Sequence, residues 1–301
     1  MPMPGKPILP CLIALGVLSG WLFTANSPPA AARNEDHPRR GPAAHVFPGS
    51  PFHAPDLRRS PELGAIGRFK VAGVRGGGSG FIVAPPDGHA PPGFDIVLTA
   101  AHLIFDANCQ RRDGGGGFEF LPAGRKNAAT RRVMIYAYGN ACPYQHWDED
   151  WAVVVVKPKL SPTFGAMEIT DLHRRLEEAP TKMPIAVVAG GYHPGERAVR
   201  IAGPCHLYTP PANSPVDTRS WLNDCSLVVG QSGGPVMVAP RTLFPDRHTH
   251  TAIALQTSQV TGEPNTALPA FRPHGNASVA LPIRAEIIEA VTAAAKETHR
   301  F

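Results

Sequence analysis

Short apolar runs recur along most of the chain, and each is bounded by glycine, proline or polar residues. Runs of this length without helical spacing are typical of β-strands. They lie at residues 64–74, 79–84, 95–101, 132–138, 151–156, 184–192, 197–203, 226–230, 234–239, 251–257 and 277–283. Because residues 157–184 separate two clusters of runs, the sequence predicts an all-β protein built as antiparallel barrels or a sandwich.

One long helix is expected at residues 283–298, because its apolar residues repeat at helical spacing. The apolar face consists of Ile283, Ile287, Ile288, Val291, Ala294 and Ala295. Since the helix directly follows the second cluster of strands, we expect it to pack on the second half of the chain.

The N-terminus has the pattern of a secretory signal. Lys6 precedes an apolar segment at residues 8–23, and Ala30 and Ala32 supply the small residues typical of a cleavage site. We therefore expect residues 1–32 to be a signal peptide and the protein to be secreted or periplasmic. The alternative is an uncleaved anchor, which is disfavoured because the apolar segment falls short of the roughly 20 residues that span a bilayer.

Residues 33–61 contain six prolines and no hydrophobic periodicity, which is typical of an extended linker or pro-segment. The rest of the chain has the composition of a folded protein, since 43% of all residues are apolar. The net charge is only +5, and the arginines are scattered without neighbouring aromatic residues. This pattern indicates solvated surface charge and argues against nucleic-acid binding.

Beyond Cys11 in the expected signal, the chain has four cysteines, namely Cys109, Cys142, Cys205 and Cys225. An even number of cysteines suits disulfide bonding outside the cytosol. Four cysteines allow three pairings, of which the sequential one, Cys109 with Cys142 and Cys205 with Cys225, places one bridge in each half of the chain. A zinc site is the alternative, but no CxxC or HExxH spacing supports it.

Ser232 lies between glycines and is a candidate nucleophile. A serine hydroxyl attacks well only when a base takes its proton and a third group orients that base. His102 directly follows the apolar run at 95–101, where rigid backbone would hold its side chain. Asp150 is the last acid before the wholly apolar run at 151–156, where its charge could orient an imidazole. Asp148 is the rival acid.

Three segments in this order resemble the signature blocks of the chymotrypsin-like serine peptidases. They are VLTAAH at 97–102, DWAVVV at 150–155 and GQSGGPV at 230–236. Two further segments, GSGFIVAP at 78–85 and VVAGGYHPG at 187–195, are similar to the secreted bacterial branch that includes glutamyl endopeptidases. The order also argues against an α/β-hydrolase, in which the serine comes first and the histidine last.

The resemblance covers residues 62–298 and implies two antiparallel six-stranded β-barrels. The first barrel is expected at about residues 62–160, the second at about 175–282, and the C-terminal helix at about 283–298.

The resemblance also implies a role for each block. His102 would be the general base, Asp150 would orient it, and Ser232 would form the acyl-enzyme. The backbone N–H groups of Gly230 and Ser232 would form the oxyanion hole. Thr99 is either a hydrogen-bond donor to the buried aspartate or an ordinary strand threonine.

The sequence departs from the family at the turn and near the pocket. Gln231 stands where trypsin has the acid that pairs with a new N-terminus, so activation by that ion pair is not expected. Leu103 stands in place of a cysteine beside the histidine. Ser226 is expected near the floor of the substrate pocket and Gln256 and Thr257 on its wall. None of them identifies the side chain that would precede the cleaved bond.

The expected function is therefore a secreted, monomeric serine endopeptidase acting on protein or peptide substrates, with no metal or organic cofactor and no nucleic-acid partner. No stable membrane association is expected unless the signal is retained. A catalytically silent binding module on the same fold, or an esterase using the same site, are the alternatives.

Overall fold

The computed structural model describes residues 47, 49–74, 76–89, 91–122, 131–178, 183–194, 197–211, 219–240, 243, 248–261 and 276–297. All of these belong to one compact unit, Pro38–Phe301. The expected signal at 1–32 and the first part of the expected linker lie outside the described residues. No helix in the described ranges is long and apolar enough to cross a membrane.

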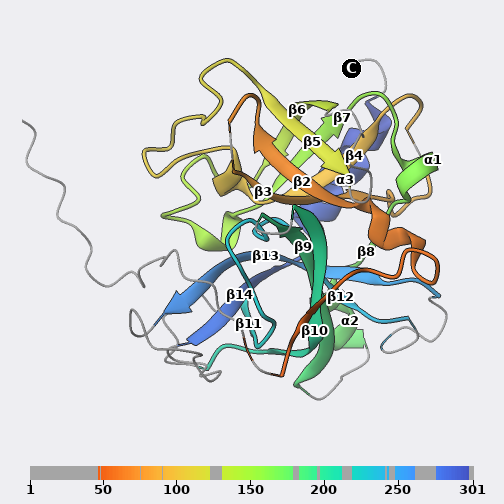
Figure 1. Cartoon of the computed structure of the whole chain (residues 1–301), viewed down its shortest axis with the longest axis vertical. Helices are drawn as coiled ribbons and strands as arrows, with labels where there is room; N and C mark the ends of the chain where they lie inside the picture. The colour runs from red at the N-terminus through yellow and green to blue at the C-terminus, as the bar shows by residue number, and fades with distance from the viewer. Residues whose placement is uncertain are drawn as a thin grey trace, which may run out of the picture. The chain divides into compact units, whose positions relative to one another are not determined.

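The first barrel is a closed ring of antiparallel strands (Figure 1). It contains β2 (Ile66–Val71), β3 (Gly78–Val83), β4 (Asp95–Thr99), β5 (Phe118–Pro122), β6 (Arg131–Tyr138) and β7 (Ala152–Val156). The strands follow one another around the ring in the order β2-β3-β4-β7-β6-β5.

The second barrel lies beside the first and is also closed, because β9 pairs with both β10 and β12. Its strands are β9 (Ile185–His193), β10 (Ala198–Tyr208), β11 (Trp221–Asn223), β12 (Pro235–Val238), β13 (Thr251–Thr261) and β14 (Asn276–Pro282). Two short strands extend it, β1 (Phe52–His53) beside β10 and β8 (Glu168–Ile169) parallel to β13. The predicted pair of six-stranded antiparallel barrels is confirmed.

The remaining elements are short. They are the 3-10 helices η1 (Pro61–Ala65), η2 (Ala101–Leu103) and η3 (Trp147–Glu149) and the α-helices α1 (Ser161–Phe164), α2 (Leu172–Glu178) and α3 (Ala285–Lys296). The segment between the barrels carries α1, β8 and α2.

The wholly apolar strand β7 is explained by burial on both of its faces. Val154 points into the first barrel, whereas Val153 and Val155 belong to a different apolar cluster, which also contains residues of the second barrel and Ile287 of α3. Successive side chains of a strand point to opposite faces, so both faces must be apolar here.

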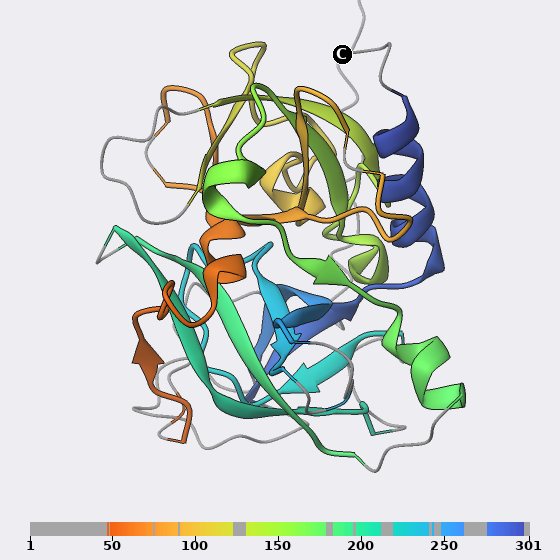
Figure 2. The same cartoon turned by 90° about the vertical axis from the view of Figure 1, so that its right-hand side faces the viewer.

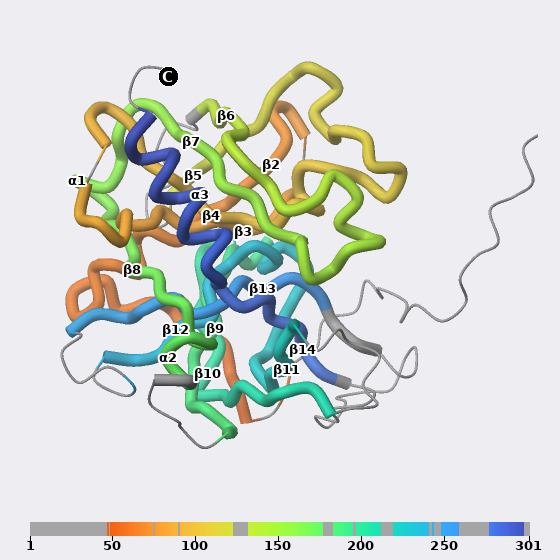
Figure 3. Tube along the Cα trace, turned by 180° about the vertical axis from the view of Figure 1, so that it is seen from behind, coloured from red at the N-terminus to blue at the C-terminus, as the bar shows by residue number. Residues whose placement is uncertain are grey.

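The C-terminal helix α3 packs against the first barrel, not on the second half of the chain as expected. It contacts β4 and β7, and Figure 2 and Figure 3 show it running along that barrel. Ile287 and Val291 are fully buried there. The expectation was wrong because the outer faces of β4 and β7 are apolar and need a cover, which the chain supplies after it leaves β14.

Residues 226–230 do not form the expected strand. The N–H of Val228 donates to the side-chain Oε1 of Gln231, and the Val228 carbonyl accepts from the Gln231 N–H, so neither group is available to a sheet. The strand in this region is β11 instead, which the apolar pattern did not indicate because it is so short.

The end of the expected linker is packed on the second barrel. Phe47 is 4% exposed, and Phe52 and His53 of β1 pair with Ala202 and Ile201. This part of the linker is ordered because its backbone groups find partners on β10, and in the described residues the folded domain therefore begins before residue 62.

Both disulfides follow the sequential pairing, Cys109 with Cys142 and Cys205 with Cys225. The first lies in the first half of the chain and the second joins β10 to the segment before Ser226. All four cysteines are therefore used in disulfides, and the zinc alternative that required them is excluded.

Candidate active site

His102 and Asp150 are brought together by the pairing of β4 with β7. Thr99 and Ala152 are paired residues at one end of these two antiparallel strands. His102 lies in η2, just after the end of β4, and Asp150 lies between η3 and the start of β7. Adjacent strand ends thus place both side chains at the same edge of the first barrel.

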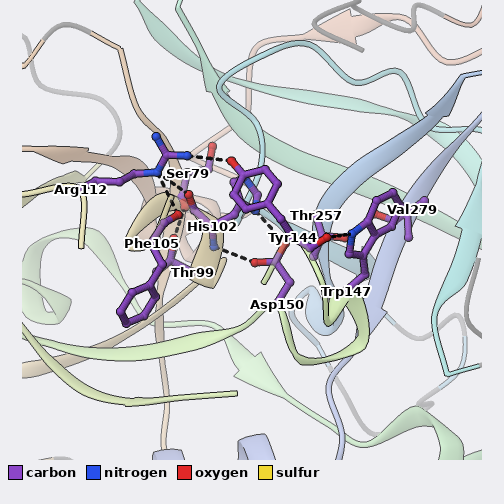
Figure 4. Close-up of polar contacts among 10 residues, drawn as sticks. All are labelled: Ser79, Thr99, His102, Phe105, Arg112, Tyr144, Trp147, Asp150, Thr257 and Val279. Atoms are coloured by element: carbon purple, nitrogen blue, oxygen red, sulfur yellow. Dashed lines mark hydrogen bonds and ion pairs between the residues drawn. The ribbon is translucent and has the colours of Figure 1, made fainter. Parts of the chain in front are cut away.

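The two residues are joined twice. His102 Nδ1 lies 2.7 Å from Asp150 Oδ2, and the His102 backbone N–H donates to Asp150 Oδ1 at 2.8 Å (Figure 4). Asp150 is fully buried and His102 is 8% exposed. A carboxylate held in this way keeps the imidazole in one orientation and favours the tautomer with its proton on Nδ1, which leaves Nε2 as the basic nitrogen.

The turn that carries Ser232 lies against the end of β4. The Ser232 carbonyl accepts a hydrogen bond from the Ser79 N–H at 2.7 Å. A Cβ on Gly233 would lie 2.6 Å from Thr99 Oγ1 and 2.9 Å from the Ala100 nitrogen, so only glycine fits at this position. This close approach brings the serine turn of the second barrel to the segment that leads into His102.

The Ser232 hydroxyl donates no hydrogen bond to another residue in the described part of the chain. Catalytic hydrogen bonds are commonly long or misaligned before substrate binds. The side chain is partly exposed, so it is accessible from solvent.

The backbone of the serine turn leaves two N–H groups unpaired. Within the described residues, Gln231, Gly233 and Gly234 each donate a backbone hydrogen bond, whereas Gly230 and Ser232 donate none. Gly230 has φ +103°, a conformation that side chains rarely adopt, and a Cβ there would lie 2.9 Å from Pro194 Cδ. The unpaired N–H groups are those expected to form an oxyanion hole.

The rival acid Asp148 has a different role. Its carboxylate pairs with Arg219, and its backbone carbonyl accepts from Arg284 Nη2 at 2.6 Å. These contacts join the loop before Asp150 to the second barrel and to the start of α3. Asp148 is therefore a structural residue, and of these two acids only Asp150 has a hydrogen bond to His102 in the described chain.

The two open interpretations of Thr99 are now distinguished. Its hydroxyl donates to the Ser79 carbonyl at 2.7 Å, so the single hydroxyl proton is not directed at Asp150.

Gln231 is 2% exposed, and its side chain closes its own turn by accepting from the Val228 N–H at 2.8 Å. The turn is thus closed by a neutral hydrogen bond.

The residues expected at the substrate pocket are all buried. Ser226 is 1% exposed, and its hydroxyl accepts from the Phe47 N–H at 2.9 Å. The Gln256 backbone joins the serine turn, because its N–H donates to the Gly234 carbonyl and its carbonyl accepts from the Gly233 N–H. Thr257 Oγ1 donates to the Val279 carbonyl at 3.3 Å. Gln256 therefore lies beside the turn that carries Ser232, whereas Ser226 contacts Phe47, in the segment expected to be a linker.

Sequence reasoning missed Arg112 and Tyr144 beside His102. Arg112 Nε donates to the carbonyls of His102 and Phe105 at 2.8 and 3.0 Å, and its Nη2 donates to the Tyr144 hydroxyl at 2.7 Å (Figure 4). The Tyr144 ring lies edge-on to the His102 ring, with centroids 6.2 Å apart. Neither residue lies in a recognisable motif, and no pattern in the chain could have indicated them.

Comparison with solved structures identifies the fold. A thermostable serine protease from an extremophilic microorganism aligns with a TM-score of 0.53 and 16% identity, over 79% of this chain and 99% of its own. A Glu endopeptidase, solved in complex with MPD, aligns with a TM-score of 0.53 and 12% identity, over 84% of this chain and 100% of its own. No protein-family model and no curated protein sequence matches the chain. The fold is the two-barrel fold of chymotrypsin-like serine proteases.

Proposed function

We propose that the protein is an exported serine endopeptidase that hydrolyses peptide bonds through an acyl-enzyme on Ser232. The observation that carries the proposal is the buried pair of His102 Nδ1 and Asp150 Oδ2, 2.7 Å apart, at the strand ends against which the Ser232 turn packs. The fold shared with a serine protease and a Glu endopeptidase supports it.

In the proposed reaction His102 Nε2 takes the proton of the Ser232 hydroxyl as Oγ attacks the carbonyl carbon of the substrate. The N–H groups of Gly230 and Ser232 donate to the oxyanion of the tetrahedral intermediate. The C–N bond then breaks, His102 gives its proton to the amine leaving group, and an ester to Ser232 remains. Water repeats the sequence, with His102 as base, and releases the acid.

Asp150 remains ionised throughout this reaction. It holds the imidazole through Nδ1 and stabilises the positive charge that the ring gains when it accepts the serine proton. Complete burial of the carboxylate strengthens this interaction, because little solvent screens it.

Export is proposed from the two disulfides together with the N-terminal sequence. Disulfides form and persist outside the reducing cytosol, in secreted or periplasmic proteins. The signal expected at residues 1–32 provides the route.

Labelling with a fluorophosphonate probe tests the proposed function, because the probe reacts only with an activated serine. We expect the probe to label Ser232 in wild type, as located by mass mapping of the modified peptide, and labelling to vanish in Ser232→Ala. The matched control Ser161→Ala, in α1, removes a serine hydroxyl away from the turn and should retain labelling.

Absence of labelling in folded wild-type protein freed of residues 1–32 would overturn the proposal and favour a silent binding module. If Ser232 is labelled but only ester substrates turn over, the protein is an esterase. Turnover of matched ester and amide substrates distinguishes these outcomes.

A further inference from the structure

Ser79, on β3, connects both barrels at the serine turn. It is fully buried and takes part in four hydrogen bonds, each 2.7 Å long. Its N–H donates to the Ser232 carbonyl and its hydroxyl donates to the Gly230 carbonyl. The hydroxyl also accepts from the Tyr192 N–H of β9, and the Ser79 carbonyl accepts from Thr99 of β4.

The two carbonyls that Ser79 holds belong to the two residues whose N–H groups are unpaired. Gly230 has no side chain to restrict its rotation, and glycine populates many backbone conformations. The hydrogen bond from the Ser79 hydroxyl to the Gly230 carbonyl restricts rotation of the peptide unit that contains this carbonyl. The Gly230 N–H lies in the preceding peptide plane, so the hydrogen bond acts on its direction by holding one of the two peptide planes that meet at the Gly230 Cα.

The strand β3 is closely packed around Ser79, whose hydroxyl joins two backbone groups. A Cβ on the neighbouring Gly78 would lie 2.4 Å from the Leu103 side chain and 2.7 Å from the Ser232 carbonyl oxygen. A Cβ on Gly80 would lie 3.0 Å from the Leu98 carbonyl. Both positions lie on the face of β3 opposite to the Ser79 side chain, so that face is closely packed, and the Ser79 side chain itself is fully buried. Serine is the smallest residue that can bridge the Gly230 carbonyl and the Tyr192 N–H.

We infer that the Ser79 hydroxyl is a positioning group that aims the Gly230 N–H at the oxyanion of the substrate. The inference rests on the proposed function and adds a residue from the first barrel to the oxyanion hole of the second. It predicts that loss of the hydroxyl weakens stabilisation of the reacting centre while the His102–Asp150 pair is unaffected.

The test is the rate of fluorophosphonate labelling in Ser79→Ala, measured at saturating and subsaturating probe. Attack on phosphorus develops negative charge on the phosphoryl oxygen. This oxygen would accept hydrogen bonds from the same N–H groups as a substrate oxyanion. Removing one such donor costs on the order of a hundred- to a thousand-fold, so misaiming it should lower the saturated rate by about tenfold or more. The pH at which labelling reaches half its maximum should not change, because the base is unaltered.

Thr292→Val in α3 is the matched control. Thr292 Oγ1 donates to the Ile288 carbonyl at 2.8 Å, so this variant also loses a hydroxyl bonded to backbone, but away from the site. Its labelling rate should stay within about twofold of wild type, since surface changes of this kind rarely affect a distant site. A near-isosteric second variant, Ser79→Cys, serves if Ser79→Ala does not fold, because a thiol is a weak donor.

A saturated labelling rate in a folded Ser79 variant equal to that of wild type would overturn the inference and leave a purely structural serine. This result is distinct from failure of the proposed function, in which wild-type protein itself is not labelled. A slower rate accompanied by a shifted pH profile would also overturn it, since that outcome would show that the variant acts through His102.

Discussion

Cys109 and Cys142 form a disulfide that joins the segment following His102 to the segment preceding Asp150. The bond links the two loops that carry the proposed base and its carboxylate partner. The second disulfide, Cys205 with Cys225, lies in the other barrel.

The double variant Cys109→Ser/Cys142→Ser should therefore lose both stability and activity. On the chain-entropy model, a loop closed by residues 33 apart contributes about 3 to 4 kcal/mol to the free energy of unfolding. The variant Cys205→Ser/Cys225→Ser should lose a similar amount. At a temperature well below the unfolding midpoints of both variants, kcat should fall in the first variant only. Equal kcat values in the two variants would show that the first disulfide does not position the site.

Replacing Asp150 by asparagine should lower kcat by about 10⁴-fold, because an amide favours the wrong imidazole tautomer. Asp148→Asn loses its ion pair with Arg219 but no contact with His102. It should reduce stability and change kcat much less. Peptide hydrolysis at several pH values checks both variants. A larger loss of kcat in Asp148→Asn than in Asp150→Asn would reverse the assignment of the two acids.

Arg112→Lys should lower kcat by roughly tenfold, since a displaced base costs up to about a hundredfold. A lysine cannot reproduce the fork that contacts the His102 carbonyl, the Phe105 carbonyl and the Tyr144 hydroxyl. Tyr144→Phe loses only the last of these bonds and should have a smaller effect. The kinetics of both variants, with unfolding midpoints as control, test this order, and a reversed order contradicts it.

Gly230→Ala should abolish most activity. The substitution forces a side chain into φ +103° and against Pro194, which would displace the N–H of the proposed oxyanion hole. A loss of kcat on the order of a hundredfold is expected. The control Gly88→Ala also has positive φ, +74°, but nothing lies within 4 Å of its Cβ position. It should cost only about 1 to 2 kcal/mol of stability and no activity. Retention of wild-type kcat in folded Gly230→Ala would exclude the proposed hole.

The Glu62–His250 pair should make the free energy of unfolding depend on pH. The pair joins η1 to the residue before β13, with His250 Nδ1 2.7 Å from Glu62 Oε1. Burial alone would raise the pKa of Glu62, but the hydrogen bonds and the charge of His250 outweigh it and lower the pKa below its ordinary 4.5. The contribution to stability is therefore complete above pH 4.5 and is lost as the pH falls through the lower pKa of the folded protein.

The unfolding midpoint of wild type should accordingly drop more steeply than that of Glu62→Gln between about pH 5 and pH 3. Asp87→Asn is the control. The pKa of Asp87 is also lowered, mainly by the His89 N–H, but the His89 side chain is largely exposed. Removal of the Asp87 carboxylate should therefore change the pH dependence of the unfolding midpoint less. Parallel curves of unfolding midpoint against pH for wild type and Glu62→Gln would contradict a role for the pair in pH-dependent stability.

Much of the fold could be predicted because its signals are local. The apolar runs indicated most strands, including β4 and β7, since burial on one or both faces restricts which residues a strand can hold. The placement of His102 and Asp150 also followed from the sequence, because each directly adjoins such a run. The run at 226–230 misled, since a turn closed by Gln231 can contain as many apolar residues as a strand.

The sequence by itself determined which residues are candidates for the chemistry and in what order the strands follow. The tertiary structure alone decided which distant groups meet: Ser79 with the Gly230 carbonyl, Arg112 with Tyr144, Phe47 with Ser226, and α3 with the first barrel. The physical reason is that most of these contacts join a side chain to a backbone group, or cover an apolar face, and any residue type supplies a backbone carbonyl or N–H. Such partners leave no pattern in the chain, and only the closed barrels bring them within hydrogen-bonding distance.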